Sequence, residues 1–451
     1  MSPKNVVNKI LNLEKKYNLF KIEIDNIFFY QLIRMNLYYY IVGKKKIYNP
    51  QKSFSYRNFL KILFYILKDI FHFKKRKKLF INDVCIIQHP RRIDNKDIYT
   101  YYIKKIFKNF TVLHQSAGNN FSFDKNSINY DYYLIKKKIF SLVGISNCKK
   151  NHNLKKIILI FKKTFQLDND FDSFFYSSVQ DQLNSYKIAS KFLKNTKFKK
   201  IIVVNSYANK GLIYAANILN INTVELQHGI INKNHLGYHF PKIKKNKLES
   251  FPNELILYGN FWKDKANFPI ERKKIFSLGS PYFEENYIKF KKIKKKNGRI
   301  LILSQQTTQK YLLKFIGEII KNNKNIKFTY KAHPKEDITV STNYFKKYNL
   351  INNVDIVKGN KNVYSLFKNH ETQIGVFSTA LFEGYACKLK TGILKAPGWE
   401  NIKFLKNYNN VHMLKNFTDF YKMINLKNKK FSENFYKRNS KKNLNKFLSL
   451  I

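Results

Sequence analysis

One β-α-β pattern near the middle of the chain constrains the fold more than any other feature. The apolar, β-branched run Ile201–Val204 predicts a buried strand, and Thr223–Leu226 predicts a second one. Between them, Gly211–Leu219 has the spacing of a helix, and its two alanines allow close packing on a sheet. Two strands joined by such a helix run parallel with a right-handed crossover. The pattern therefore predicts an α/β fold.

A second α/β series follows a charged segment that ends in Asn-Gly. Further strands are predicted in "RILILSQ", "IKFTYKAHPKE" and "TQIGVFSTALFEGYACKLKTGIL", and "QKYLLKFIGEIIKN" has helical spacing. The 451 residues suffice for two hydrophobic cores. We therefore predict two Rossmann-like domains that face each other across a cleft, with a helical N-terminal extension. The expected parts are a helical N-terminal region (1–80), a first Rossmann-like domain for the acceptor (81–284), a linker (285–298), a second Rossmann-like domain for the nucleotide donor (299–430) and a C-terminal helix (431–451).

The formal net charge of +56 comes mainly from lysine. Such a charge attracts polyanions, which include nucleotides, anionic lipids and nucleic acids. Arginine, which reads bases and phosphates with two hydrogen bonds, is scarce and scattered, and this speaks against nucleic acid as a partner. The abundance of Lys, Asn, Ile, Phe and Tyr is also typical of a genome poor in G and C. Function and codon bias both remain explanations of the charge.

The cysteines and the N-terminus favour a cytoplasmic protein. Cys85, Cys148 and Cys387 are far apart and have neither metal nor disulfide spacing. The N-terminus has no apolar core of a secretory signal, and no uncharged run reaches the ~20 residues that span a bilayer. One segment, Phe59–Lys78, is apolar and aromatic and ends in a basic cluster. It suits either a helix at the anionic inner face of the membrane or a core helix with a solvated end.

The stretch "VELQHGIINKNHLGYHFP" places a candidate site at a strand end. Ligands of open α/β sheets bind at the carboxyl ends of the strands, and His228 follows the strand that ends at Leu226. A neutral histidine is the usual general base near neutral pH, so His228 is the candidate catalytic base. Its alternative role is a loop histidine bonded to neighbouring carbonyls. The candidate acceptor or loop residues around it are Gln227, Gly229, His235, Tyr238 and His239.

Three histidines within twelve residues also raise the question of a metal. No cysteine or carboxylate cluster accompanies them at ligand spacing, so we expect no metal. If His228 binds the donor instead, the base is expected among Glu225, His235 and His239.

Two strand ends in the second series carry candidate donor-binding residues. The strand Lys327–Tyr330 leads to His333, and Pro334 restricts its backbone to extended geometry. A histidine there can donate to a phosphate oxygen, and Lys331 adds positive charge. A His-Pro pair alone is a weak signal of phosphate binding, because the chain has another one at His89-Pro90.

The second strand end is "VFSTALFEG". Ser378 and Thr379 stand where a helix begins, and free backbone N–H groups and the helix dipole attract phosphate there. Glu383 lies one turn further, where it can accept hydrogen bonds from ribose hydroxyls. An ordinary capped helix with a solvated Glu383 is the alternative.

The order of "ELQHG…HLGYHFP", "YGNFW", "YKAHPKE" and "FSTALFEG" over residues 200–400 resembles a family of bacterial enzymes. These are surface-polysaccharide glycosyltransferases of the GT-B type with a His-Pro motif, including sialyltransferase-like, Kdo-transferase-like and teichoic-acid polymerase-like groups. The resemblance implies donor-phosphate contacts at His333, Ser378 and Thr379 and a base at His228. The paired acidic motif of sialyltransferases is missing, which speaks against a sialic acid donor.

We therefore expect a metal-independent, cofactor-free glycosyltransferase of capsule, lipopolysaccharide or similar glycans. Its partners would be a nucleotide-activated sugar, a glycan or glycolipid acceptor and the anionic inner-membrane surface. Two alternatives share the fold: a CDP-glycerol-type polyol-phosphate transferase, and a nucleotide-sugar epimerase, which needs no acceptor. An alternative of another class is a basic nucleic-acid-binding protein with steeply salt-dependent binding.

Overall fold

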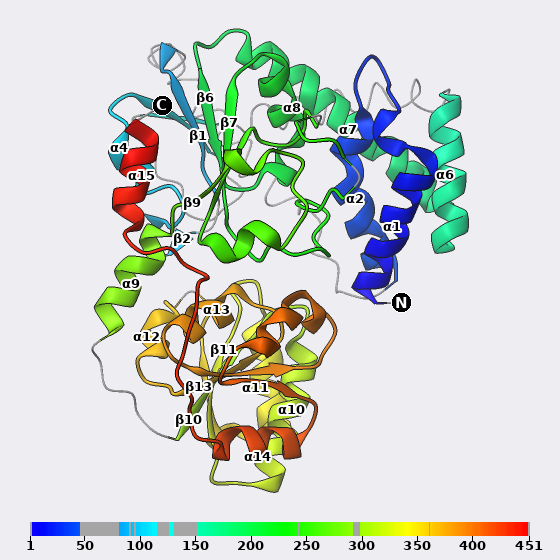
Figure 1. Ribbon diagram of the computed structural model, residues 1–451. Coiled ribbons are helices and arrows are strands. Elements are labelled where there is room, and N and C mark those ends of the chain that lie inside the picture. The colour runs from blue at the N-terminus through cyan, green and yellow to red at the C-terminus, as the bar shows by residue number, and fades with distance from the viewer. Residues whose placement is uncertain are drawn as a thin grey trace.

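The computed structural model contains two parallel β-sheets, one above the other in Figure 1. Both domains are Rossmann-like, as the sequence predicts. The structure describes residues 2–45, 81–89, 92–93, 96–114, 126–129, 151–241, 243–246, 248–291, 298–359 and 361–449.

The first sheet has seven described strands in the order β5-β4-β1-β6-β7-β8-β9, and all neighbours are parallel. The predicted β-α-β unit is present as β6 (Lys200–Val203), α8 (Lys210–Ile218) and β7 (Asn222–Leu226). Gly211 lets α8 approach α7 (Asp170–Leu193) closely, since a Cβ there would lie 2.7 Å from the Tyr186 nitrogen. The strands are β1 (Val84–Ile87), β4 (Phe110–His114), β5 (Ser127–Asn129), β6 (Lys200–Val203), β7 (Asn222–Leu226), β8 (Glu254–Leu257) and β9 (Ile275–Ser277). Around them lie β2 (Arg92–Ile93), β3 (Lys96–Asp97), α4 (Ile103–Ile106), η3 (Ser206–Ala208), α8 (Lys210–Ile218), η4 (Asn260–Asp264) and η5 (Arg272–Lys274).

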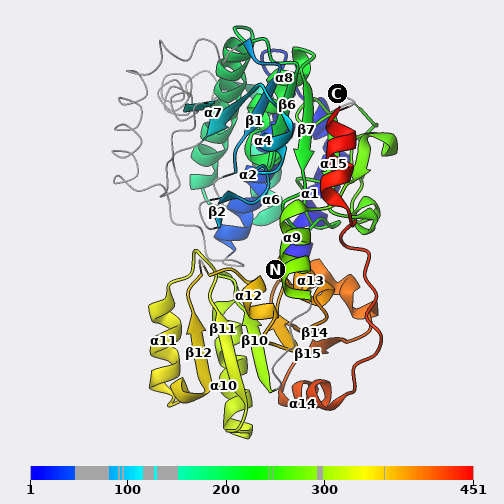
Figure 2. The ribbon, with the colours of Figure 1, turned by 90° about the vertical axis from the view of Figure 1, so that its left-hand side faces the viewer.

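The N-terminal helices pack on the side of this first domain. α1 (Pro3–Tyr17) and α2 (Phe29–Lys44), joined through η1 (Leu19–Lys21), share an apolar cluster with α6 (His152–Phe165) and α7 (Asp170–Leu193). The long α7 contacts both α2 and α8, so it connects the N-terminal helices to the sheet layer (Figures 1 and 2). The segment Phe59–Lys78 lies outside the described residues.

The second sheet has six described strands in the order β12-β11-β10-β13-β14-β15, again all parallel. The strands are β10 (Arg299–Leu303), β11 (Lys327–Lys331), β12 (Val354–Val357), β13 (Thr372–Gly375), β14 (Lys390–Leu394) and β15 (Val411–Leu414). The helices are α10 (Gln309–Asn322), α11 (Ile338–Lys347), η6 (Ile351–Asn353), α12 (Tyr364–Phe367), α13 (Thr379–Ala386), η7 (Trp399–Asn407) and α14 (Phe417–Asn425). Apolar residues at helical spacing bury one side of α10 in the core of this domain.

The chain passes between the two domains twice. α9 (Pro281–Lys291) leads away from the first domain, and the last helix, α15 (Ser440–Ser449), returns to lie beside it (Figure 2). The predicted linker 285–298 therefore begins with helical residues. Within α9, the Glu284 carboxylate accepts hydrogen bonds from the Asn439 and Ser440 nitrogens and so joins α9 to the start of α15.

The carboxyl edges of the two sheets face each other. The loop after β7 reaches the second domain, where the Asn232 side chain donates to the Asn401 carbonyl at 2.9 Å. Asn401 lies in η7, which follows the carboxyl end of β14. After β8, the ring of Trp262 packs against Phe382 of α13, with centroids 5.0 Å apart. Residues that follow the strand ends of both sheets therefore meet at the interface.

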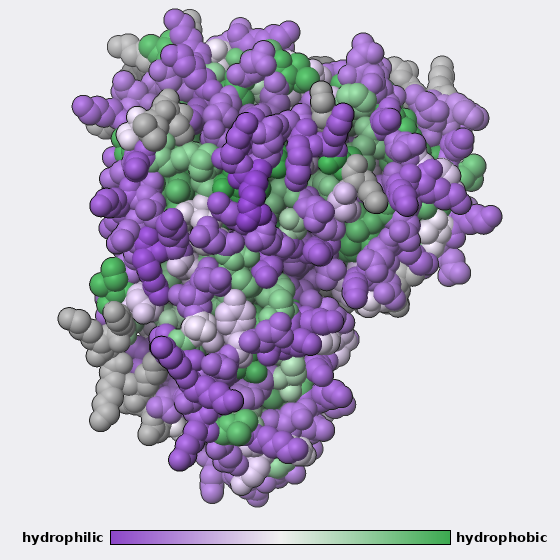
Figure 3. Space-filling model, in the orientation of Figure 1, coloured by the Kyte–Doolittle hydropathy of each residue, from purple (hydrophilic) through white to green (hydrophobic). Residues whose placement is uncertain are grey.

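The surface seen in Figure 3 is mainly hydrophilic over both domains. Among the helices that the structure describes, none has the length and apolar character needed to cross a membrane.

Candidate active site

His228 lies just beyond the carboxyl end of β7, in a segment that we call the histidine loop (residues 227–241). Its imidazole is half-buried between two tyrosines. The Tyr207 hydroxyl lies 3.1 Å from Nε2, and the Tyr238 hydroxyl lies 3.4 Å from Nδ1. Tyr207 comes from η3, directly after β6, so two neighbouring strand ends hold the ring from both sides.

A buried carboxylate stands behind Tyr238. The Tyr238 hydroxyl donates to Glu225 Oε1 at 2.7 Å, and the Ser206 nitrogen donates to the same oxygen at 3.3 Å. Glu225 is fully buried in β7, and this burial raises the pKa of its carboxyl group. Among the described residues, Glu225 Oε2 has no hydrogen-bond partner. Burial also lowers the pKa of the nearby Lys210 to about 7, while the charge of Glu225 opposes that shift.

The direction of these bonds assigns the tautomer of His228. Tyr238 donates its proton to Glu225, so its oxygen is left to accept from His228 Nδ1–H. Nε2 is then the basic nitrogen, with the Tyr207 hydroxyl beside it. The order Glu225, Tyr238, His228 resembles the arrangement in which an acid orients a catalytic imidazole and stabilises its protonated form, with a tyrosine inserted between the two.

Two aromatic residues that sequence reasoning missed complete this cluster. The ring of His89, which follows β1, lies 5.9 Å from the ring of His228. The Tyr99 hydroxyl donates to the His228 carbonyl at 3.2 Å. His89 follows β1, and in the first sheet β6 lies between β1 and β7, the strand that leads to His228. The strand-end rule, applied to every strand, would have found His89.

The other predicted residues of the histidine loop have defined places. Gln227 is buried, where its side chain donates to the Gly229 carbonyl and accepts from the Tyr258 nitrogen. Among the described residues, apart from the two chain neighbours of Gly229, no heavy atom lies within 4 Å of a Cβ built at this glycine, so there is open space beside it.

His235 and His239 are held by the backbone. Nδ1 of His235 accepts from the Gly237 nitrogen, and Nδ1 of His239 accepts from the Asn267 nitrogen, each at 3.1 Å. Burial, together with the proximity of His228, lowers the pKa of His235 to about 3. Burial lowers the pKa of His239 to about 4, with a contribution from Arg34. Both rings are therefore neutral at neutral pH.

On the second domain, His333 lies two residues beyond β11. Its Nδ1 accepts from the Lys335 nitrogen at 3.1 Å, so a neutral ring carries its proton on Nε2. Its backbone nitrogen donates to Glu336, a buried carboxylate. Pro334 is exposed and packs against Gly359, where a Cβ would lie 2.5 Å from the proline Cα.

The Lys331 side chain is bonded to the backbone of two neighbouring loops. Its ammonium is largely buried and donates to the carbonyls of Ala332 and Gly359, at 3.1 and 2.6 Å. These bonds join the loop that carries His333 to the loop after β12. The Lys331 ammonium therefore holds these two loops together and also brings positive charge to this strand end.

Ser378 is the N-cap of α13, as predicted, and its Oγ accepts from the Ala380 nitrogen at 3.2 Å. Thr379 is the first residue of the helix, and Glu383 is half-buried one turn later. The strand ends of β10 and β13 are linked here, since the Gln305 side chain bonds to both the nitrogen and the carbonyl of Phe377.

Within the described part of the chain, no group of three or more His, Cys, Asp or Glu residues could hold a metal ion.

No protein-family model and no curated protein sequence matches the chain. Several solved structures have a similar course of the chain. UDP-GlcNAc 2-epimerase from Methanocaldococcus jannaschii has a TM-score of 0.48 and 13% identity, covering 82% of this chain and 99% of that one. MurG from Acinetobacter baumannii has a TM-score of 0.47 and 10% identity, also covering 82% and 99%. At TM-scores below 0.5, the function of this chain has to be inferred from its own site.

Proposed function

We propose that the protein is a metal-independent glycosyltransferase that moves a sugar from a nucleotide-activated donor to a hydroxyl of a growing surface glycan, such as a capsule or a lipopolysaccharide. The observation that carries the proposal is the chain of Glu225, Tyr238 and His228 at the carboxyl edge of the first sheet. That edge faces the second domain, in which His333 and Ser378 follow two strand ends.

In the proposed reaction, His228 Nε2 takes the proton of the acceptor hydroxyl as this oxygen attacks the anomeric carbon. The new bond forms from the acceptor oxygen to that carbon. The bond from the carbon to the phosphate oxygen breaks, and the nucleotide leaves with that electron pair. The imidazolium that forms is stabilised through Tyr238 by the buried Glu225. Tyr207 sits beside Nε2 and orients the ring for this step.

The second domain would bind the donor. His333 Nε2–H would donate to a phosphate oxygen, and the first N–H groups of α13 and the Thr379 hydroxyl would bind the leaving phosphate. Glu383, one turn along α13, would accept from the ribose hydroxyls. The role proposed for Lys331 is to hold the His333 loop through its two carbonyl contacts.

The experiment is a screen of CMP-, CDP-, UDP- and GDP-activated sugars and CDP-glycerol, each with and without a glycan acceptor. The proposal is supported if nucleotide is released only when the acceptor is present and if a glycoside of the acceptor is formed. Isomerisation of the sugar without an acceptor would instead make the protein an epimerase, and release of CMP from CDP-glycerol would make it a polyol-phosphate transferase. A folded protein that turns over none of these donors contradicts the proposal.

A further inference from the structure

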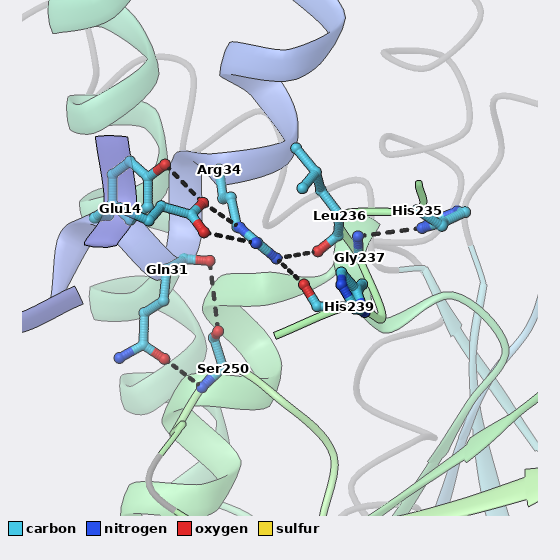
Figure 4. Close-up of polar contacts among 9 residues, drawn as sticks. Glu14, Gln31, Arg34, His235, Leu236, Gly237, His239 and Ser250 are labelled. Atoms are coloured by element: carbon cyan, nitrogen blue, oxygen red, sulfur yellow. Dashed lines mark hydrogen bonds and ion pairs between the residues drawn. The ribbon is translucent and has the colours of Figure 1, made fainter. Parts of the chain in front are cut away.

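A buried arginine connects the N-terminal helices to the histidine loop (Figure 4). Arg34 of α2 is 2% exposed, and its guanidinium forms a two-point ion pair with Glu14 of α1. Nε donates to Oε1 at 2.6 Å, and Nη2 donates to Oε2 at 2.8 Å. Glu14 also accepts from the Tyr30 hydroxyl at 2.9 Å. The ion pair therefore fixes the plane and the direction of the guanidinium.

The remaining arm of the guanidinium points into the histidine loop. Nη1 donates to the Leu236 carbonyl and, at 3.0 Å, to the His239 carbonyl. These two carbonyls stand on either side of Tyr238 in the sequence. The Phe240 ring covers the guanidinium, 4.3 Å from its centre, and so shields these bonds from water.

We propose that Arg34 is a positioning residue of the active site: it fixes the turn over residues 235–239 so that the Tyr238 hydroxyl reaches Glu225 and His228 together. The catalytic meaning of this contact rests on the function proposed above. The turn has its own bonds, from the nitrogens of Tyr238 and His239 to the His235 carbonyl at 2.9 and 3.0 Å. These bonds shape the turn but do not attach it to the rest of the molecule, whereas Arg34 does.

It follows that the N-terminal helices are a working part of the site, although none of the sequence motifs for donor or base lies in them. A second contact from α2 supports this. Gln31 accepts from the Ser250 nitrogen at 2.9 Å, and the Ser250 carbonyl in turn accepts from Lys210, the buried lysine near Glu225, at 2.8 Å. Helix α2 thus contacts the histidine loop and also Ser250, whose carbonyl binds Lys210.

The test compares Arg34→Lys with Tyr30→Phe. Lysine keeps the charge that balances the buried Glu14, so the fold is retained, but one ammonium cannot make both the two-point pair and the two carbonyl bonds. Tyr30→Phe removes a buried hydrogen bond to the same Glu14 and leaves the carbonyl contacts intact, which makes it the matched control. Hydrogen exchange at the Tyr238 and His239 amides, and the titration of the His228 ring followed by NMR, are measured in both variants without any sugar.

In Arg34→Lys we expect these amides to exchange at least about tenfold faster and the His228 titration to move, with neither change in Tyr30→Phe. With a donor and an acceptor, kcat should fall by about 10²-fold while KM for the donor stays near wild type, because the reacting groups are misplaced. Unchanged exchange and titration in Arg34→Lys, or equal changes in both variants, would overturn the proposal. If the loop responds as expected but the wild-type protein shows no transfer, the positioning contact stands and the proposed function fails.

Discussion

At the scale of single residues, the site depends on polar groups that burial forces into one protonation state. Burial keeps His235 and His239 neutral by lowering the pKa of each imidazole, and each ring accepts a backbone N–H on Nδ1. Burial also favours the neutral form of Glu225 and so raises the pKa of its carboxyl group, while hydrogen bonds from Ser206 and Tyr238 oppose this by favouring the carboxylate. His228 is half-buried beside these groups, between the hydroxyls of Tyr207 and Tyr238.

The two neutral histidines predict an acid-sensitive fold. Unfolded histidine binds its proton near pH 6.5, whereas His235 and His239 bind theirs only at about pH 3 and 4. Between these values the unfolded state holds more protons, so the stability that is present above pH 6.5 is lost as the pH falls. Each histidine contributes a slope of up to about 1.4 kcal/mol per pH unit in that window.

Urea unfolding between pH 4 and 7 measures this slope. His239→Asn keeps a side-chain acceptor for the Asn267 nitrogen but cannot be protonated, so its free energy of unfolding should depend less steeply on pH. The exposed His152, replaced in the same way, is the control and should leave the slope unchanged. The same pH dependence in all three proteins would show that His239 is not the source.

At the scale of helices and strands, the return of the chain to the first domain explains two glycines. A Cβ at Gly259 would lie 2.6 Å from the Phe435 carbonyl, and one at Gly279 would lie 2.3 Å from the Lys437 carbonyl. Each glycine lies two residues beyond the end of a strand, Gly259 after β8 and Gly279 after β9. The chain that returns from the second domain passes directly over both glycines. The Trp262 side chain also donates to the Phe435 carbonyl at 2.9 Å. The returning segment is therefore attached along its length before α15 begins.

Glu284 at the end of this path makes a testable contribution to stability. Its carboxylate accepts from the backbone nitrogens of Asn439 and Ser440 and caps α15. Glu284→Ala should lower the free energy of unfolding by about 1–2 kcal/mol, the cost of a lost helix cap. The next residue provides the control: Glu285 forms a partly exposed ion pair with Lys441, and Glu285→Ala should cost under about 1 kcal/mol. Equal losses in calorimetry or urea unfolding would contradict the capping role.

The sequence predicted local elements better than contacts between segments that are far apart in the chain. The β6-α8-β7 unit, the strand before His333 and the N-cap at Ser378 were predicted because each depends on a local pattern of apolar or capping residues. The Arg34 contact and the approach of His89 to His228 depend on packing between segments far apart in the sequence, and no local pattern encodes them. The bonds of Lys331 to two carbonyls likewise arise from the packing of neighbouring loops.

At the scale of the whole molecule, two sheets face each other through residues that follow their strand ends, and the chain carries a formal net charge of +56. The interface is apolar around Phe382 and polar around Asn401. The basic surface suits an enzyme whose proposed donor, and the proposed membrane surface near it, are both anionic. The segment Phe59–Lys78, which lies outside the described residues, remains the sequence's candidate for the membrane contact.

Vesicle binding tests that candidate. The protein should bind anionic vesicles and not neutral ones, and high salt should abolish the binding. Replacing the basic residues of the cluster Lys74–Lys78 with glutamine should weaken sedimentation with anionic vesicles. An equal number of exposed lysines replaced on the second domain is the control. Binding that survives loss of the cluster would assign this segment a structural role only.

The proposed base is tested most directly by replacing His228 with alanine and measuring sugar transfer and nucleotide affinity on the same protein. A general base contributes ~10²–10⁴-fold to a rate, so transfer should fall by about that factor while nucleotide affinity stays near wild type. A folded His228→Ala protein that transfers sugar at a near-normal rate would contradict the account. If nucleotide affinity falls together with the rate, His228 is a donor ligand and the base lies elsewhere.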